Sequence, residues 1–379
     1  MRDSQHYALN DMRRYVNAAN FGLILDNSNA RYNEAIWRRY ANWDRPSDSK
    51  EWIQGQKETP IMVRASVLGT HSPKPQRNGG GWKVYGGDIM KIGHGFSIDE
   101  DDLFEMRRER ALTGVPYALQ MTETVQEKSD NMIGGIHTEL NYVTLQAMST
   151  GEIHDFSIDG TKFDFKFPIK ADHFMEVTKP WWKIEGGKVV ADDTVDVVQD
   201  ILDAQKFLTR DLRLAVDHWK VSIEWFDRFI AHPRVIAGAM GRVRGIIDTT
   251  NTKLTQAEIL GYLHEMGVWK FDVIDSQSAH EEDGLSVPDA PAFDEHNMVA
   301  ASSLILPFTM KCTNSIYFDR ESMGQIGDQH KYFLVEDRIM VLRSTEERPF
   351  KNIVDCELYA APVFNNVREW GFLKTWSED

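Results

Sequence analysis

Cysteine is scarce in this chain, which has only Cys312 and Cys356 among its 379 residues. A disulfide framework is therefore excluded, and two reduced thiols are expected rather than one bridge. No apolar run approaches the roughly 20 residues of a membrane-spanning helix, and the first residues lack the apolar core of a secretion signal. These absences predict a protein that is made in the cytoplasm and has no membrane partner.

Basic residues are outnumbered, with 43 Lys and Arg against 58 Asp and Glu and a formal net charge of -15. General nucleic-acid binders need a basic surface because counterion release drives their affinity, so only weak, non-specific contact with DNA is expected. Hydrophobic residues make up 42% of the chain and include 11 Trp and 19 Phe, which is enough for sizeable cores in two or three domains.

The motifs of common catalytic sites are missing. The sequence has no Walker-type phosphate loop, no His-Glu-x-x-His or paired-cysteine zinc motif and no Gly-x-Ser-x-Gly elbow. Glu152, His154 and Asp155 could form an acid–base cluster, but a polar strand flank explains them better. The sequence therefore predicts that the chain is not an enzyme and has no catalytic residue, no metal site and no bound cofactor.

Local patterns predict several helices. Two short ones are expected within residues 1–55, separated at Asn27 to Asn29, and another over 97–114, with the acidic run from Asp99 to Asp102 at its dipole-favoured start. Residues 117–150 have apolar positions at three- and four-residue steps, which predicts one helix of roughly 50 Å. Gly134-Gly135 predicts a bend there or close packing against another backbone.

Strand patterns alternate with these helices. Residues 61–67 and 82–85 predict a long two-stranded excursion with Gly79-Gly80-Gly81 at its tip, and Asp159-Gly160 predicts a hairpin turn. After residue 194 the patterns predict a helix over 198–212, a helix ending at His232-Pro233, and a helix opened by a capping box from Thr255 to Glu258. Further strands are expected at 268–274, 297–305, 332–342 and 354–363. The whole chain is predicted to be α+β.

The order of these elements resembles that of the major capsid proteins of tailed bacteriophages, in the branch similar to the lambda capsid protein E, with the Hong Kong 97 phage-type fold. The resemblance covers residues 55–375, and the first 55 residues match no pattern of that family. The segments that carry it are Phe104-Glu-Met-Arg-Arg-Glu-Arg-Ala111, Leu145-Gln-Ala-Met-Ser-Thr-Gly151, Phe163-Asp-Phe-Lys-Phe167, Trp181-Trp182, Glu224-Trp-Phe-Asp-Arg-Phe-Ile-Ala-His-Pro233, Gly267-Val-Trp-Lys-Phe-Asp-Val-Ile-Asp275 and Cys356-Glu-Leu-Tyr-Ala-Ala-Pro-Val363.

This resemblance implies a capsid fold with an N-terminal arm, an extended E-loop hairpin, a long spine helix, and peripheral and axial domains. The expected segments are 1–55 for the arm, 56–96 for the E-loop, 97–194 for the peripheral domain with spine helix 117–150, 195–340 for the axial domain, and 341–379 for the return to the peripheral domain. Inter-subunit contact is expected at the E-loop tip, through Arg77, Asn78, Gly79, Gly80, Gly81 and Trp82.

The resemblance further implies a subunit that self-assembles into hexamers and pentamers and forms an icosahedral shell around the viral DNA genome. Its expected location is the virion, and its expected partners are further copies of itself and the portal, scaffolding and decoration proteins. Two alternatives stay open. One is an encapsulin-like nanocompartment shell that encloses cargo protein, and the other is an acidic hydrolase that uses Glu152 and Asp155.

Overall fold

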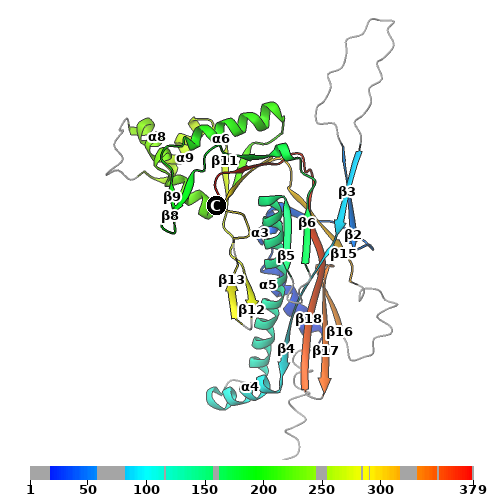
Figure 1. Cartoon of the computed structure of the whole chain (residues 1–379). Helices are drawn as coiled ribbons and strands as arrows, with labels where there is room; N and C mark the ends of the chain where they lie inside the picture. Colours follow the sequence, from blue (N-terminus) through cyan, green and yellow to red (C-terminus); the bar gives the residue numbers. More distant parts are fainter. Residues whose placement is uncertain are drawn as a thin grey trace, which may run out of the picture. The chain divides into compact units, whose positions relative to one another are not determined.

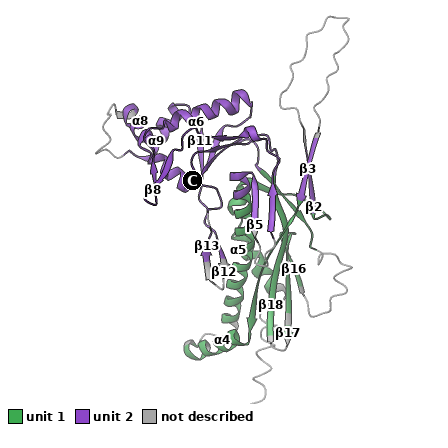
Figure 2. Cartoon of the chain, in the orientation of Figure 1, with its two compact units in different colours: residues 1–50, 88–144, 308–363 green, residues 51–87, 145–307, 364–379 purple. Residues whose placement is uncertain are grey.

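The computed structural model describes residues 18–57, 82–114, 117–156, 162–244, 254–282, 285–289, 291–315, 331–347 and 350–377. The chain folds into two compact units (Figure 2). Unit 1 contains residues 1–50, 88–144 and 308–363, and unit 2 contains residues 51–87, 145–307 and 364–379. Both units mix helices with strands, so the α+β class expected from the sequence is confirmed. No helix among the described residues is long and apolar enough to cross a membrane.

Unit 1 is built on a six-stranded sheet (Figure 1). Its strands run in the order β1-β15-β18-β17-β16, and β4 pairs with β18 over residues 90–99. The elements of this unit are α2 (Ala18–Ala30), α3 (Ile36–Tyr40), β1 (Ala41–Trp43), β4 (Met90–Asp99), α4 (Glu100–Thr113), β15 (Phe308–Thr313), β16 (Lys331–Val335), β17 (Ile339–Glu347), β18 (Phe350–Phe364) and most of α5 (Tyr117–Thr150).

The long helix α5 has the bounds that its apolar spacing predicts. Its buried side chains recur at helical steps, and Gly151, with a φ of +74°, ends it. At the double glycine, the atoms nearest to an added Cβ belong to side chains rather than to the neighbouring backbone that was one of the two expectations. A Cβ on Gly134 would lie 2.3 Å from the Tyr32 hydroxyl, and one on Gly135 would lie 2.9 Å from the His94 ring.

The expected helix after residue 97 is also confirmed, and its acidic start caps it. The Asp99 carboxylate accepts hydrogen bonds from the backbone N–H groups of Asp101 and Asp102. Gly114 follows the helix with a φ of +71°. The acidic run therefore satisfies helix N–H groups at the start that the helix dipole favours.

Unit 2 is built on a five-stranded sheet in the order β11-β10-β14-β19-β7, and its described residues also form four two-stranded sheets, β2-β3, β5-β6, β8-β9 and β12-β13. Its core contains Trp181 and Trp182, which are both buried, so the tryptophan pair packs a core. Its elements are β2 (Glu51–Lys57), β3 (Trp82–Asp88), β5 (Glu152–Phe156), β6 (Lys162–Lys166), β7 (Phe174–Glu176), β8 (Trp182–Glu185), β9 (Lys188–Ala191), α6 (Val197–Lys206), β10 (His218–Ser222), α7 (Ile223–Ile230), α8 (Pro233–Arg244), α9 (Gln256–Glu265), β11 (Lys270–Ile274), β12 (Ala279–Glu282), β13 (Leu285–Pro288), β14 (Asn297–Ala301) and β19 (Gly371–Lys374).

Several local expectations are confirmed in unit 2. Strands β5 and β6 form the antiparallel pair that the Asp159-Gly160 signal predicted, although the turn itself lies outside the described residues. The Thr255 and Glu258 side chains form both hydrogen bonds of the predicted capping box, and Gly267 follows with a φ of +90°. The strand expected at 61–67 lies outside the described residues.

Other expectations need correction. Helix α2 runs through Asn27 to Asn29, because Ser28 and Asn29 are buried and the Ser28 hydroxyl donates to the Ile24 carbonyl within the helix. Residues 51–55 were expected in the helical arm, but they belong to strand β2 (Glu51–Lys57), since β2 pairs with β3. Helix α6 ends at Lys206 and a π-helical turn follows. The single strand expected at 332–342 is two, β16 and β17, joined by a turn with positive φ at Glu336 and Asp337.

The two units also differ from the expected segments. Residues 308–340 were expected to join residues 195–307 in one domain, but they belong to unit 1. The reason is strand pairing, since β15 and β17 both pair with β18, and β16 pairs with β17.

Candidate functional site

The expected inter-subunit contact residues belong to the segment between β2 and β3. Arg77 to Gly81 lie outside the described residues, and Trp82 is the first residue of β3. The two strands form a two-stranded sheet within unit 2. An isolated two-stranded sheet is only marginally stable in water, so what each of its faces contacts indicates its role.

One face of the β2–β3 sheet is held by a chain of aromatic rings, here called the aromatic anchor. Successive rings are in contact, mostly edge to face, which adds to the stabilisation from burial alone. The ring centroids are 5.7 Å apart for Trp52 and Tyr85, 5.3 Å for Trp52 and Phe165, 4.8 Å for Phe165 and Phe167, 4.7 Å for Phe167 and Phe364, and 4.8 Å for Phe364 and Trp370.

Two further contacts fix the sheet on the aromatic anchor. The Tyr85 hydroxyl donates a hydrogen bond of 3.0 Å to the Phe364 carbonyl, and burial raises the pKa of Tyr85 to about 12, so the hydroxyl keeps its proton. A Cβ on Gly87 would lie 2.5 Å from the Phe165 ring, so glycine allows the strand to approach this closely. The base of the sheet is therefore fixed within unit 2.

The opposite face of the β2–β3 sheet carries two large aliphatic side chains in solvent. Ile53 is 70% exposed and Val84 is 67% exposed, whereas their neighbours Trp52 and Tyr85 join the aromatic anchor. Adjacent residues of a strand point to opposite faces, which explains the contrast. The sheet thus presents an uncovered apolar face on a fixed base.

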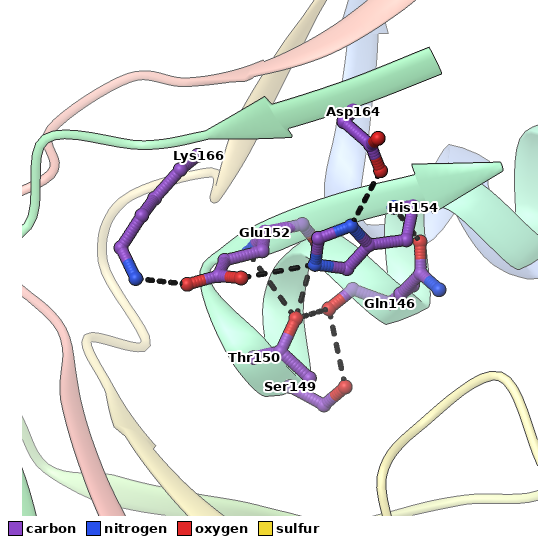
Figure 3. Close-up of polar contacts among 7 residues, drawn as sticks. All are labelled: Gln146, Ser149, Thr150, Glu152, His154, Asp164 and Lys166. Atoms are coloured by element: carbon purple, nitrogen blue, oxygen red, sulfur yellow. Dashed lines mark hydrogen bonds and ion pairs between the residues drawn. The ribbon is translucent and has the colours of Figure 1, made fainter. Parts of the chain in front are cut away.

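Polar side chains gather on the neighbouring β5–β6 hairpin, and we call them the hairpin cluster: Glu152, His154, Asp164 and Lys166 (Figure 3). His154 Nδ1 lies 2.7 Å from Asp164 Oδ1, and His154 Nε2 lies 2.9 Å from Glu152 Oε2. Lys166 Nζ pairs with the other Glu152 oxygen. The Gln146 side chain at the end of α5 accepts a hydrogen bond from the His154 backbone N–H.

The hairpin cluster is electrostatically satisfied. Hydrogen bonds to Asp164 and Glu152 raise the pKa of His154, since both carboxylates favour the imidazolium. Partial burial raises the pKa of Glu152, but the hydrogen bonds from Lys166 and His154 outweigh it and leave that pKa below its ordinary value. Each charge already has an opposite neighbour, so the arrangement is that of an exposed ion-pair network.

The structure does not bring together the two carboxylates of the hydrolase alternative. Glu152 and His154 share one face of β5, and strand alternation places Asp155 on the other face, where it is paired in register with Phe163. A glycosidase-type mechanism requires two carboxyl groups that flank one bond. The Glu152–Asp155 pair is therefore excluded as such a site.

A second polar network, here called the His137 network, lies in unit 1 and was missed in the sequence. The fully buried His137 accepts a hydrogen bond from Trp37 Nε1 at Nδ1 (3.2 Å), so its proton is on Nε2, which faces Asn29 Oδ1 at 2.9 Å. The Tyr32 ring stacks on it at 5.0 Å, and the Trp37 backbone N–H donates to Asn141 Oδ1. Burial lowers the pKa of His137 to about 4, with Arg38 adding to the effect.

Two glycine-containing segments and both cysteines have structural roles. Gly93, His94 and Gly95 lie within strand β4, and Gly238 to Gly241 lie within helix α8. Cys312 and Cys356 are buried free thiols, as predicted, and burial raises the pKa of both. Within the described residues no group of three or more His, Cys, Asp or Glu side chains could hold a metal ion.

Comparisons with known proteins find matches among solved structures. No family model matches the chain, and no curated protein matches it either. The satellite phage P4 procapsid with its size-determination protein matches with a TM-score of 0.44 and 9% identity, covering 92% of this chain and 98% of that one. A phage-related protein from Bordetella bronchiseptica matches with a TM-score of 0.43 and 11% identity, covering 93% and 96%.

The mature capsid of bacteriophage PhiM1 matches with a TM-score of 0.42 and 11% identity, covering 90% of this chain and 86% of that one. Two of these structures are phage capsids or procapsids and one is a phage-related protein. All three TM-scores are below 0.5, and the function is therefore inferred from the described elements of this chain.

Proposed function

We propose that this chain is a shell-forming structural subunit, the major capsid protein of a tailed bacteriophage. Its copies assemble into hexamers and pentamers of an icosahedral shell that encloses the viral DNA genome. The proposed location is the virion, after synthesis in the host cytoplasm. The proposal also assigns the Hong Kong 97 phage-type fold, with 56–96 as the E-loop and 117–150 as the spine helix.

The β2–β3 sheet carries this proposal. One face is fixed on the aromatic anchor, while Ile53 and Val84 on the other face are 70% and 67% exposed. A rigid base with an uncovered apolar face is suited to contact with a neighbouring subunit, because burial of such side chains stabilises an interface by about 1.5–3 kcal/mol each. In the sequence, the expected contact residues Arg77 to Gly81 directly precede β3, and Trp82 is its first residue.

The polar networks support a structural role. The hairpin cluster and the His137 network are each saturated by their own hydrogen bonds and ion pairs. The acidic balance of the chain, with a net charge of -15, suits a protein that encloses DNA without binding it tightly. Portal, scaffolding and decoration proteins are the further partners that such a shell would require.

Assembly of the expressed chain tests the proposal directly. Negative-stain electron microscopy and sedimentation velocity should show closed shells or capsomer rings at high protein concentration. The paired substitutions Ile53→Ser and Val84→Ser should reduce the particle fraction at least tenfold, since about 1.4 kcal/mol corresponds to a factor of ten. Leu304→Ser is the matched control, because Leu304 is exposed in unit 2 but lies outside the sheet, and it should assemble normally.

A strictly monomeric chain with no rings or shells would refute the proposal. Normal assembly of the Ile53 and Val84 variant would show that the β2–β3 sheet is not part of the subunit interface. The nanocompartment alternative predicts particles that enclose cargo protein. DNA inside particles purified from the natural source, or a portal at one vertex, would exclude that alternative.

A further inference from the structure

Helix α4 of unit 1 has an exposed apolar side. Its inward side contains the buried Met106, while Phe104 is 60% exposed and Leu112 is 79% exposed on the outward side. Positions i, i+3, i+4, i+7 and i+8 of a helix share one face. We call these outward residues the α4 stripe, which consists of Phe104, Arg107, Arg108, Ala111 and Leu112.

The two arginines of the α4 stripe are available for a partner. Arg107 lies over the Phe104 ring at 5.6 Å. Arg108 reaches Glu105 only at 3.7 Å, with both side chains 75% exposed, and such surface pairs contribute little. The stripe therefore combines apolar ends with a positively charged middle, and it fits an apolar surface that carries an acidic group.

Helix α2 of the same unit has an exposed stripe with the opposite charge. Leu23 is 63% exposed, and Asp26, Asn27 and Ala30 follow it on the same face and are exposed too. The other side of α2 is buried through Phe21 and Leu25. We call the exposed residues Leu23, Asp26, Asn27 and Ala30 the α2 stripe.

We propose that the α4 stripe of one copy packs antiparallel on the α2 stripe of a second copy, an inference that rests on the proposed shell function. In this arrangement Leu23 meets Leu112, and Asp26 faces Arg108. Phe104 then lies over the small Ala30. The two stripes span about 12 Å and about 10 Å at 1.5 Å per residue, so their ends match.

The contact joins two different surfaces, so each copy can bind one neighbour through its α4 stripe and another through its α2 stripe. Such heterologous contacts repeat from copy to copy and close into rings when the rotation allows it. The charge pattern also favours the mixed contact. Two α4 stripes would repel each other through their arginines, and two α2 stripes would lack an opposite charge. A second copy of the chain is thus the occupant that the two stripes specify together.

Cysteine cross-linking of the full chain tests this contact. Chains carrying Leu23→Cys are mixed with chains carrying Leu112→Cys and oxidised, and the native cysteines are buried and stay out of the reaction. A disulfide-linked dimer of the two chains is expected. The control replaces Leu23→Cys with Asp48→Cys, which is exposed in unit 1 outside both stripes and should give at least tenfold less dimer.

Charge reversal provides an independent readout of the same contact. Asp26→Arg, or Arg107→Asp together with Arg108→Asp, should lower the cross-linking yield several-fold, and combining all three changes should restore most of it. The matched control reverses Arg45 and Asp48, as Arg45→Glu and Asp48→Arg, and should leave the yield unchanged. These two residues are exposed in the same unit but belong to neither helix.

The outcomes separate this contact from the shell itself. Shells that form without a Leu23–Leu112 cross-link overturn the contact and leave the shell proposal standing. A specific cross-link in a chain that forms neither rings nor shells supports the contact and refutes the shell proposal. The contact is also overturned if the Leu23–Leu112 cross-link forms in no greater yield than the Asp48 control. It is likewise overturned if combining the charge reversals does not restore the cross-linking yield.

Discussion

Each of the two units organises polar groups around a histidine, and the two histidines are in opposite states. In unit 1, His137 is fully buried and accepts a hydrogen bond from Trp37, so it is neutral. In unit 2, His154 is exposed and lies between Glu152 and Asp164, so both of its ring nitrogens face carboxylates. Burial lowers the pKa of His137 to about 4, and the carboxylates raise the pKa of His154.

The contrast shows that the environment, not the residue type, sets what a histidine contributes. A buried network must satisfy every donor and acceptor, because an unpaired buried group costs about 1–3 kcal/mol. An exposed network is screened by water and salt, and its pairs contribute about 0–1 kcal/mol. The His137 network should therefore determine stability, whereas the hairpin cluster should respond to pH with little structural consequence.

Removing the imidazole rings of His137 and His154 should give the largest difference in the free energy of unfolding. His137→Ala should lower the free energy of unfolding by about 2–4 kcal/mol, because it leaves a cavity and unpaired groups on Trp37 and Asn29. His154→Ala should cost less than about 1 kcal/mol. Urea unfolding of the unassembled chain, followed by tryptophan fluorescence, measures both.

A double-mutant cycle shows whether the His137 loss comes from the hydrogen bond. Trp37→Phe removes the donor, so it should cost clearly less in the His137→Ala background than in the native chain. Equal costs in both backgrounds would mean that the Trp37–His137 bond contributes nothing to stability. Equal losses for His137→Ala and His154→Ala would contradict the contrast between the two units.

Acidification should affect the two histidines with opposite signs. The unfolded chain protonates His137 near its ordinary pKa of about 6.5, while the folded chain resists until about pH 4. Stability should therefore fall as pH drops through this window, by up to about 3 kcal/mol. His154 has a raised pKa in the folded chain, so its contribution is present below its ordinary pKa and is lost as pH rises through the folded value.

Comparing variants separates the contributions of His137 and His154 to the pH dependence of stability from those of the other titrating groups. The stability gap between native chain and His137→Ala should narrow as the pH falls from 6.5 towards 4. The gap between native chain and His154→Gln should instead widen as the pH is lowered. Urea midpoints recorded at several pH values give both gaps, and parallel curves for all three chains would refute the two assignments.

The double glycine of α5 offers a smaller test beside the His137 network. Alanine is favoured over glycine in a helix interior by about 1 kcal/mol. Gly135→Ala should keep most of this gain, because the exposed His94 ring can move away. Gly134→Ala should instead lower stability by about 1 kcal/mol, since its Cβ would displace Tyr32, which stacks on His137 at 5.0 Å. Thermal unfolding compares the two, and stabilisation by both would contradict the tight fit at Tyr32.

The sequence predicts the elements whose signals are local. The apolar spacing of α5, the capping box at Thr255 and the alternating phenylalanines of β6 each lie within a few turns or residues. The turn between β16 and β17 was missed because Glu336 and Asp337 adopt positive φ without the Asn-Gly or Asp-Gly pattern that usually marks such a turn.

Long-range partners are not visible in such patterns. The His137 network joins Asn29 and Trp37 to a residue 100 or more positions away, and β4 pairs with β18 across more than half of the chain. In the hairpin cluster, the sequence offered Asp155 as the partner of Glu152. The register of the hairpin instead places Lys166 beside Glu152 and Asp164 beside His154, because alternation puts all four on the same face.

The smallest expected effect concerns the hairpin cluster alone. Glu152→Gln removes one of the two carboxylates that face His154, so the pKa of His154 should fall towards its ordinary value, with a stability change within about 0.5 kcal/mol. Lys166→Ala is the opposing control, because it frees Glu152 from its cation and should raise the pKa of His154 further. Histidine-labelled NMR titration reads both shifts at the ring carbon. Shifts of the same sign would show that His154 and Lys166 do not compete for the Glu152 carboxylate, and the cluster would then be a set of separate pairs.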